Sequence, residues 1–577
     1  MDTHVGTVDH AGQGDLTPPT PTEGTTQVPI QVAKHEGARG RLRSRRPAVL
    51  VMAALVLLLL APACGASGGT AKPLSSEVVD VTVLDNSFNP ETLVITPGTT
   101  VRWTNKGKLD HNSIVAVGDL KFGVDAKDFG PGKSHQFTFD KVGEYSYYCS
   151  LHGTAERGMT GKIVVTNDPK SVGTTPGTQP VNMDVVKGDG VVLKVPAQFP
   201  TIQGAVDAAK AGDMVLVSKG IYHEAVKVTK DNIVIRGEDR NETVLDGEFK
   251  LDNGFLVSGA NGVAIENMTA KNYKVNGFFW TGVKGYRGSY LTAIRNGDYG
   301  LYGFDSRYGQ FDHSLGTGSP DAGFYIGQCY PCDALITDSE SYLNGLGYSG
   351  TNAGGNLRIV RSTFRDNRSG IVPNSGSYEK YPPERESTIV GNIVYGNSRR
   401  DVPAINAALL LEGDGIVSAG GIDNVIERNL VYDHDKAGIL LLGFPDGDKV
   451  WDVTGNKVRD NDVSDSRVAD LAMVTKDENL GNCFSGNVFK SSTPANIEKL
   501  APCTGPSAGS LTDGALGLAS YINATDRPPV DFKTMPDPPA QTTMPDPLSA
   551  PWKPAAPGNL PTITVDVAAI PLPTKPS

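Results

Sequence analysis

The sequence of 577 residues lacks several features that define familiar classes of protein. It has nine histidines and no His-x-His pair, which argues against a multicopper oxidase with a trinuclear centre. It has no excess of positive charge, because the formal net charge is −11, and this argues against nucleic acid as a partner. The apolar run at residues 48–61 is too short for a membrane-spanning helix, which needs about 20 residues.

Glycine and proline, in contrast, are abundant, with 67 and 39 residues. Both residue types favour turns, so the composition predicts turn-rich β structure rather than helices. Apolar residues make up 39% of the chain, which is enough to bury a core. At roughly 100–200 residues per domain, the length predicts several domains. We therefore expect an all-β protein with more than one domain.

The first 64 residues have the character of an export signal. Residues 1–45 are polar and end in arginines, which predicts a disordered tail, and residues 46–64 join a basic flank to a short apolar core and small residues. The segment that ends at Cys64 resembles a bacterial lipoprotein cleavage site, with simple cleavage and an uncleaved anchor as alternatives. We expect a bacterial protein exported to the outer face of the cytoplasmic membrane or the cell envelope, held at the membrane by an N-terminal lipid or signal anchor.

One short loop offers three side chains that can bind a metal: a thiolate, an imidazole and a thioether. An alternating strand runs into Cys149, His152 follows three residues later and Met159 seven residues after that. His111 lies upstream between two strand-like segments. A thiolate, two imidazoles and a weak thioether are the ligands of a blue-copper site. The alternative is that Cys149 forms half of a disulfide, Met159 lies in the core and both histidines are surface residues, but the spacing favours a metal.

Residues 78–166 resemble a cupredoxin of the plastocyanin, pseudoazurin and amicyanin kind. The resemblance rests on the strand-like segments at 88–105 and 132–145, on Asp110-His111 and on the Cys149 loop. It implies a Greek-key β-sandwich with type 1 copper, Cu(II)/Cu(I), ligated by His111, Cys149, His152 and Met159, which passes single electrons to a redox partner protein. Six residues separate His152 from Met159, which is more than in the members of the family with the shortest ligand loops. We interpret His135, in a strand pattern, as a surface residue.

The remaining four cysteines fall into two local pairs. Cys329 and Cys332 lie close together, as do Cys483 and Cys503, and in an oxidising compartment each pair predicts a disulfide. The first pair has the spacing of a redox motif as its alternative. Such a motif needs a helix N-terminus to lower the thiol pKa, and no helix is predicted there.

A sequence repeat of about 23 residues runs through residues 277–370. Glycines that open short apolar runs recur with gaps of 23, 23, 24 and 23 residues, at Gly277, Gly300, Gly323, Gly347 and Gly370. Units of this length bury their apolar faces by stacking on one another. Later units carry asparagine-rich turns, and a polar insertion at about 376–386 predicts a loop over one face.

The segment before the repeats, 199–217, has helical spacing followed by strands. This opening resembles the N-terminal cap of pectin-lyase-like right-handed parallel β-helices, the class that includes the accessory protein of nitrous oxide reductase maturation. We therefore predict linkers at 65–77 and 167–190, a right-handed parallel β-helix at 191–505 and a Pro-rich disordered tail at 506–577.

The fold class of the second domain does not decide its chemistry. We expect it to bind a partner or a cell-wall or extracellular polysaccharide. The alternative is a carbohydrate-active enzyme of the lyase, hydrolase or epimerase type with an accessory copper domain. Candidate polar residues for one groove are Asp305, Asp312, His313, Asp321, Arg365, Arg368, Glu412, Asp414, Asp433 and His434. Aromatic residues that could stack on sugars, with the coil core as the alternative, are Phe278, Phe279, Trp280, Tyr299, Tyr302 and Tyr325.

Overall fold

The computed structural model describes residues 78–116, 122–155, 158–168, 181–475, 481–509, 511, 517, 521 and 530–576. Residues 74–577 group as one compact unit. Among the described residues, no helix is both long and apolar enough to cross a membrane. The predicted disordered tail, signal segment and first linker, 1–77, lie outside the described residues, as do 169–180 of the second linker.

The first part of the chain is a sandwich of two sheets around an aromatic core. One sheet has the order β2 (Ser87–Asn89), β1 (Val78–Leu84), β4 (Thr99–Asn105) and β7 (Ser134–Phe139). The other has the order β3 (Thr92–Ile95), β9 (Gly158–Val165), β8 (Gly143–Gly153), β5 (Ser113–Val115) and β6 (Gly123–Val124), and η1 (Ala126–Asp128) precedes β7. Trp103 and Tyr147 are buried where the two sheets meet, 5.6 Å apart between ring centroids. The predicted β-sandwich is confirmed.

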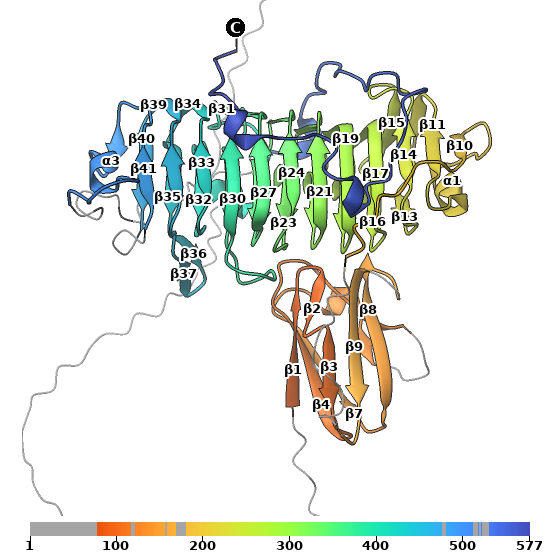
Figure 1. Ribbon diagram of the computed structural model, residues 1–577. Helices are drawn as coiled ribbons and strands as arrows, with labels where there is room; N and C mark the ends of the chain where they lie inside the picture. Colours follow the sequence, from red (N-terminus) through yellow and green to blue (C-terminus); the bar gives the residue numbers. More distant parts are fainter. Residues whose placement is uncertain are drawn as a thin grey trace, which may run out of the picture. The chain divides into compact units, whose positions relative to one another are not determined.

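The second part is a parallel β-helix, whose strands lie side by side in Figure 1. We call its larger sheet the long sheet. It contains, in order, β10 (Val192–Val195), β11 (Met214–Val217), β12 (Gly220–Tyr222), β14 (Val234–Gly237), β15 (Thr243–Asp246), β17 (Val263–Lys271), β19 (Lys284–Ile294), β21 (Arg307–Asp312), β22 (Leu315–Thr317), β24 (Ala334–Thr337), β25 (Glu340–Tyr342), β27 (Gly354–Val360), β28 (Thr363–Arg365), β30 (Arg385–Val390), β31 (Ile393–Tyr395), β33 (Val425–Glu427), β34 (Leu430–His434), β38 (Lys457–Arg459), β39 (Asp462–Ser466) and β41 (Cys483–Ser485).

The facing sheet, which we call the short sheet, carries one strand from each coil. It contains β13 (Val226–Val228), β16 (Asn253–Ser258), β18 (Asn276–Thr281), β20 (Tyr299–Phe304), β23 (Ala322–Gly327), β26 (Leu346–Thr351), β29 (Ser369–Asn374), β32 (Ile416–Ala419), β35 (Ala437–Leu442), β40 (Ala469–Val474) and β42 (Ser492–Thr493). The remaining elements are the hairpin β36 (Phe444–Asp446) and β37 (Lys449–Trp451), the helices α1 (Ile202–Ala208), α2 (Asn406–Leu410) and α3 (Ile497–Leu500), and η2 (Phe532–Thr534), η3 (Pro557–Asn559) and η4 (Val567–Ala569).

The glycine repeat found in the sequence is the register of the short sheet. Each repeat glycine lies in one of the strands β18, β20, β23, β26 and β29, and the residue after it points into the coil core. Phe278 pairs with Leu301, which pairs with Phe324, so residues of like character stack along the axis. Since one coil cannot bury this face alone, stacking stabilises all of them together. The predicted parallel β-helix is confirmed, with α1 at its start, where the Thr201 side chain accepts a hydrogen bond from Gly204 N.

Buried asparagines form a second ladder at the turns. The Asn392 side-chain amide donates to Asn429 Oδ1 at 3.0 Å, and Asn429 donates to Asn461 Oδ1 at 3.0 Å. Each carbonyl oxygen also accepts the backbone N–H of the preceding member, at 3.0 and 2.9 Å. These amides satisfy buried backbone groups that the turn leaves without a strand partner.

Both predicted disulfides are present, between Cys329 and Cys332 and between Cys483 and Cys503. The first fixes the turn after β23. The second ties β41 to the segment after α3, at the C-terminal end of the coil stack. The structure therefore favours a structural role for the Cys329 pair over the redox alternative.

The predicted disordered tail is wrong for residues 530–576. This segment, which we call the strap, runs along the outer surface of the long sheet, where Met535, Ala555, Ala556 and Ile570 are buried. Its prolines predicted an extended chain, and an extended chain exposes carbonyl oxygens that the sheet can bind. Five arginines donate to them: Arg240 to Thr542, Arg236 to Ala550, Arg287 to Lys553, Arg295 to Met535 and Arg428 to Ile570.

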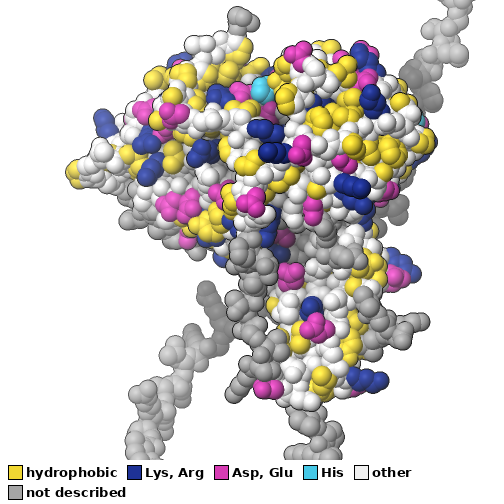
Figure 2. Space-filling view, turned by 45° about the vertical axis from the view of Figure 1, so that its right-hand side comes forward, with side chains coloured by type: hydrophobic (Ala, Val, Ile, Leu, Met, Phe, Trp, Pro, Cys, Tyr) yellow, Lys and Arg dark blue, Asp and Glu magenta, His cyan; other side chains and the backbone are white. Residues whose placement is uncertain are grey.

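The surface carries both signs of charge. On the face shown in Figure 2, basic and acidic side chains are mixed among hydrophobic ones and do not gather into one field. Ion pairs of the long sheet include Arg361 with Asp338 (2.8 Å) and Arg365 with Glu340 (2.7 Å). Such partly exposed pairs contribute little to stability.

The asparagine ladder gives a stability prediction. Asn429→Ala removes the acceptor of the Asn392 backbone N–H and the donor to Ile389 O. Each buried group left without a partner costs about 1–3 kcal/mol, so we expect the β-helix to unfold at a clearly lower temperature by calorimetry. The control Asp452→Ala, at an exposed position of the β-helix, is expected to change the free energy of unfolding by about 0.5 kcal/mol or less. Equal effects of the two variants would contradict the role of the ladder.

Candidate metal centre

Three of the predicted ligands meet at one end of the sandwich. Cys149 and His152 lie on the last residues of β8, and His111 lies just before β5, the neighbouring strand. The two Nδ1 atoms of the histidines are 3.1 Å apart, and Cys149 Sγ is 3.5 Å from His152 Nδ1 and 3.8 Å from His111 Nδ1. Distances of this size separate ligand atoms that share one transition-metal ion, bound at about 2.0–2.3 Å.

The donors are shielded from water and chemically ready for a metal. Cys149 and His111 are buried, and Cys149 is the free cysteine of the described residues. Burial by itself would raise the pKa of the Cys149 thiol, but hydrogen bonds and charge from His111 and His152 lower it to about 5. The thiolate, which is the form that binds metals, is thereby favoured.

An amide pair holds the two ligand loops together. The Asn112 side chain donates to Ser150 Oγ at 2.9 Å and accepts the Ser150 backbone N–H at 2.8 Å. The Asn112 backbone N–H lies 3.4 Å from Cys149 Sγ and points to it as a donor. Behind His111, Asp85 Oδ1 lies 3.7 Å from the outer nitrogen Nε2. Partners of this kind fix the orientation of metal ligands.

Met159 and His135 occupy different positions with respect to this cluster. Met159, the second residue of β9, is 2% exposed and belongs to the same buried cluster as Cys149. His135 is half-buried, not a surface residue as we expected, because its ring stacks on Trp103 at 4.8 Å and its Nε2 contacts Ser113 Oγ at 3.0 Å. Burial lowers the pKa of His135 to about 4. It does not belong to the ligand cluster.

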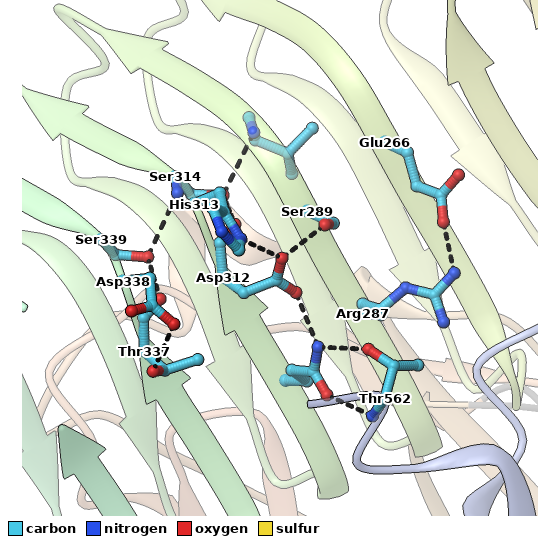
Figure 3. Close-up of polar contacts among 12 residues, drawn as sticks. Glu266, Arg287, Ser289, Asp312, His313, Ser314, Thr337, Asp338, Ser339 and Thr562 are labelled. Atoms are coloured by element: carbon cyan, nitrogen blue, oxygen red, sulfur yellow. Dashed lines mark hydrogen bonds and ion pairs between the residues drawn. The ribbon is translucent and has the colours of Figure 1, made fainter. Parts of the chain in front are cut away.

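In the β-helix, Asp312 and His313 form a polar pair at the C-terminal end of β21. His313 Nδ1 lies 2.9 Å from Asp312 Oδ1, and Ser289 Oγ donates to the same oxygen at 2.6 Å (Figure 3). The hydrogen bond to Asp312 raises the pKa of His313. The His313 ring stacks on Tyr290, 4.5 Å between centroids. This pair orients one half-exposed imidazole, and the charge of Asp338 also raises the pKa of His313.

The other polar candidates of the β-helix are held in separate pairs. Their partners are Tyr299 for Asp321, Lys380 for Asp305, Arg368 for Glu412, Tyr521 for Asp414 and Glu340 for Arg365. His434 is buried and contacts Val394 O at 3.3 Å, and Asp433 is exposed. The ten candidates therefore do not line one groove.

A buried cysteine and two histidines at one end of a two-sheet β-sandwich define a cupredoxin, the class of small copper-binding β-sandwich domains. A family model described as copper binding proteins, plastocyanin/azurin family, matches residues 77–166. Plastocyanin of Tetradesmus obliquus is 34% identical over 127 residues, which cover 20% of this chain and 86% of that protein. Plastocyanin of Scenedesmus fuscus is 33% identical over 85 residues, which cover 14% of this chain and 85% of that protein. The chain belongs to the plastocyanin/azurin family of copper-binding proteins.

The β-helix has its own likeness among solved structures. The A-module of mannuronan C-5 epimerase AlgE6 from Azotobacter vinelandii is 18% identical, with a TM-score of 0.38, over 53% of this chain and 93% of that chain. The architecture assigned above rests on the strand pairings of the chain itself.

The loop-joining amide gives a prediction for copper affinity. Asn112→Ala removes both side-chain bonds to Ser150 and leaves the thiol and both imidazoles in place. Since partners that orient metal ligands contribute about 10–100-fold to affinity, we expect copper to be lost to a competing chelator at a correspondingly lower concentration. Asn167→Ala, an exposed position after β9, is the control. An unchanged affinity for Asn112→Ala would show that the loops hold their positions without this amide.

Proposed function

We propose that the sandwich carries one type 1 copper ion and passes single electrons to a redox partner protein. The observation that carries this proposal is the buried triangle of Cys149 Sγ and two imidazole Nδ1 atoms. A bound copper ion would supply the change between Cu(II) and Cu(I). His111, Cys149 and His152 would be the strong ligands and Met159 the weak axial one.

The residues around the site support electron transfer rather than substrate chemistry. His111 and Cys149 are buried, so little water would rearrange when the ion changes its charge. The two hydrogen bonds between Asn112 and Ser150 would limit movement of the ligands when the ion changes its charge. Met159, on the adjoining strand β9 and in the same buried cluster, supports the axial assignment. Membership of the plastocyanin/azurin family supports the same function.

A copper titration of the exported form tests the proposal. We expect one equivalent of Cu(II) to produce an intense blue colour through charge transfer from the Cys149 thiolate. Cys149→Ser removes the sulfur and is expected to abolish this absorption. His135→Gln alters a half-buried histidine of the same domain that lies outside the ligand cluster, so it is expected to keep the colour. A colourless wild-type complex, or blue Cys149→Ser protein, would refute the assignment.

We infer that the protein acts outside the cytoplasm. The two disulfides support an oxidising compartment, since such bonds are rare in the cytosol. The export segment at 46–64 supports the outer face of the cytoplasmic membrane or the cell envelope, with a lipid on Cys64 or an uncleaved signal as the anchor. The β-helix would then bind a partner or a cell-wall or extracellular polysaccharide.

A second candidate function is a carbohydrate-active enzyme on the β-helix with the copper domain as accessory. Tyr299 paired with Asp321 and Tyr325 paired with Glu379 favour this candidate, because such pairs can hold and move protons. Under this candidate, incubation with polysaccharides yields shortened or epimerised chains, detected by NMR of the products, and Cys149→Ser leaves the yield unchanged. Binding without any new product would favour the docking function.

A further inference from the structure

The aromatic residues of the short sheet divide between its two faces. Side chains alternate along a strand, so neighbours in sequence point to opposite faces. Phe278, Leu301 and Phe324 point into the coil core. Phe279, Tyr302 and Tyr325 point outward and form a buried cluster of their own. The outward residues do not pack inside the coils, so the coil core does not require aromatic side chains at these positions.

These outward rings pack into one stack that ends at Tyr299. Tyr302 stacks on Phe279 at 4.4 Å and on Tyr299 at 4.2 Å, with planes 12° and 27° apart. Tyr299 and Tyr302 also line a cleft of about 360 Å³, and Tyr299 is half-buried. Flat aromatic faces beside polar groups are typical of sites for small ligands that are part apolar and part polar.

Carboxylates lie at the edge of this stack and are held by its tyrosines. Tyr299 Oη donates to Asp321 Oδ2 at 2.6 Å, and Tyr325 Oη donates to Glu379 Oε1 at 2.6 Å. Glu379 comes from the insertion before β30 and is 5% exposed, yet its Oε2 has no hydrogen-bond partner among the described residues. A buried acceptor of this kind is costly to leave unpaired. It lines the cleft, so a hydroxyl of a bound ligand, which can donate or accept, would satisfy it.

The charge of the cleft limits what it can bind. Its lining includes five carboxylates and, among the described residues, one basic side chain, Lys108. The carboxylates belong to Asp85, Asp298, Asp321, Glu379 and Asp446, and neutral acceptors and donors come from Ser349, Thr351 and Asn374. Burial raises the pKa of Asp298 and Glu379 well above the usual range, so the negative charge of the lining comes from its other carboxylates. Ionised carboxylates accept hydrogen bonds from hydroxyls and repel the carboxylates of a ligand.

We propose that this cleft binds a neutral saccharide chain, with one sugar ring against Tyr299 and its hydroxyls hydrogen-bonded to Asp321 and Glu379. The inference rests on the proposed polysaccharide role of the β-helix and deepens it by naming the class of sugar. A ring with an apolar face and several hydroxyl donors matches the aromatic surface and the acceptors together. A polyuronate would bring its own carboxylates to the acidic lining.

Binding of defined oligosaccharides to the full chain tests the inference. The probes are neutral hexamers of glucose, mannose, galactose and xylose, and a hexamer of mannuronate, measured by isothermal titration calorimetry. We expect at least one neutral hexamer to bind at least tenfold more tightly than the mannuronate. Tyr299→Ala removes the half-buried ring and is expected to weaken that binding by about tenfold or more, which corresponds to about 1.4 kcal/mol. Glu379→Gln, which keeps the size of the side chain, is expected to weaken it as well.

Tyr432→Ala is the matched control. Tyr432 is also half-buried and stacked on a tyrosine, Tyr395 at 4.9 Å, but it lies on the long sheet, outside the cleft. It is expected to bind the neutral hexamer as the wild type does. Equal weakening by Tyr299→Ala and Tyr432→Ala would overturn the site. Tighter binding of mannuronate would overturn the sugar class and leave a polysaccharide role standing. Binding of none of the probes would overturn both, and the copper titration would be unaffected.

Discussion

Hydrogen bonding between the parallel strands of successive coils is the constraint on which most of this structure depends. It holds every coil in register with the next, so a residue that points outward in one coil stacks on an outward residue in its neighbours. The buried asparagine ladder extends the same constraint to the turns. The stacking of Phe279 on Tyr302 is a direct result, because the strand register alone places the two rings face to face.

The metal centre is built by the opposite means. Its three donors come from the end of β8 and from the segment before β5, where no repeat enforces their position. Side-chain hydrogen bonds replace the strand register where Asn112 joins the two segments through Ser150. Asp85 lies behind His111, 3.7 Å from its outer nitrogen. The sandwich can therefore fix a soft-metal site to within a few ångströms although its ligands are 38 and 3 residues apart in sequence.

Much of this architecture could be predicted from the sequence, because the signals are local and periodic. The spacing of Cys149 and His152 on one loop identified two donors, and the 23-residue glycine period identified the coils. Contacts between residues that are far apart in the sequence left weaker signals in it. Glu379 gave none, since only the fold brings an insertion to Tyr325 of a coil two units earlier. His135 appeared to be a surface residue because an alternating strand does not reveal that Trp103 on the neighbouring strand will cover it.

The proline-rich C-terminus was misjudged for a related reason: its composition describes a chain without a core of its own, and the core that it packs on belongs to the coils. In an array of stacked repeats each unit contacts only its neighbours, and unfolding can spread inward from an end. The strap joins Gly212, beside the first coils, through Trp552 to Arg428, many coils later, through Ile570. It thus couples units that share no strand pairing, so fraying at one end of the array would carry a free-energy cost at coils far from it.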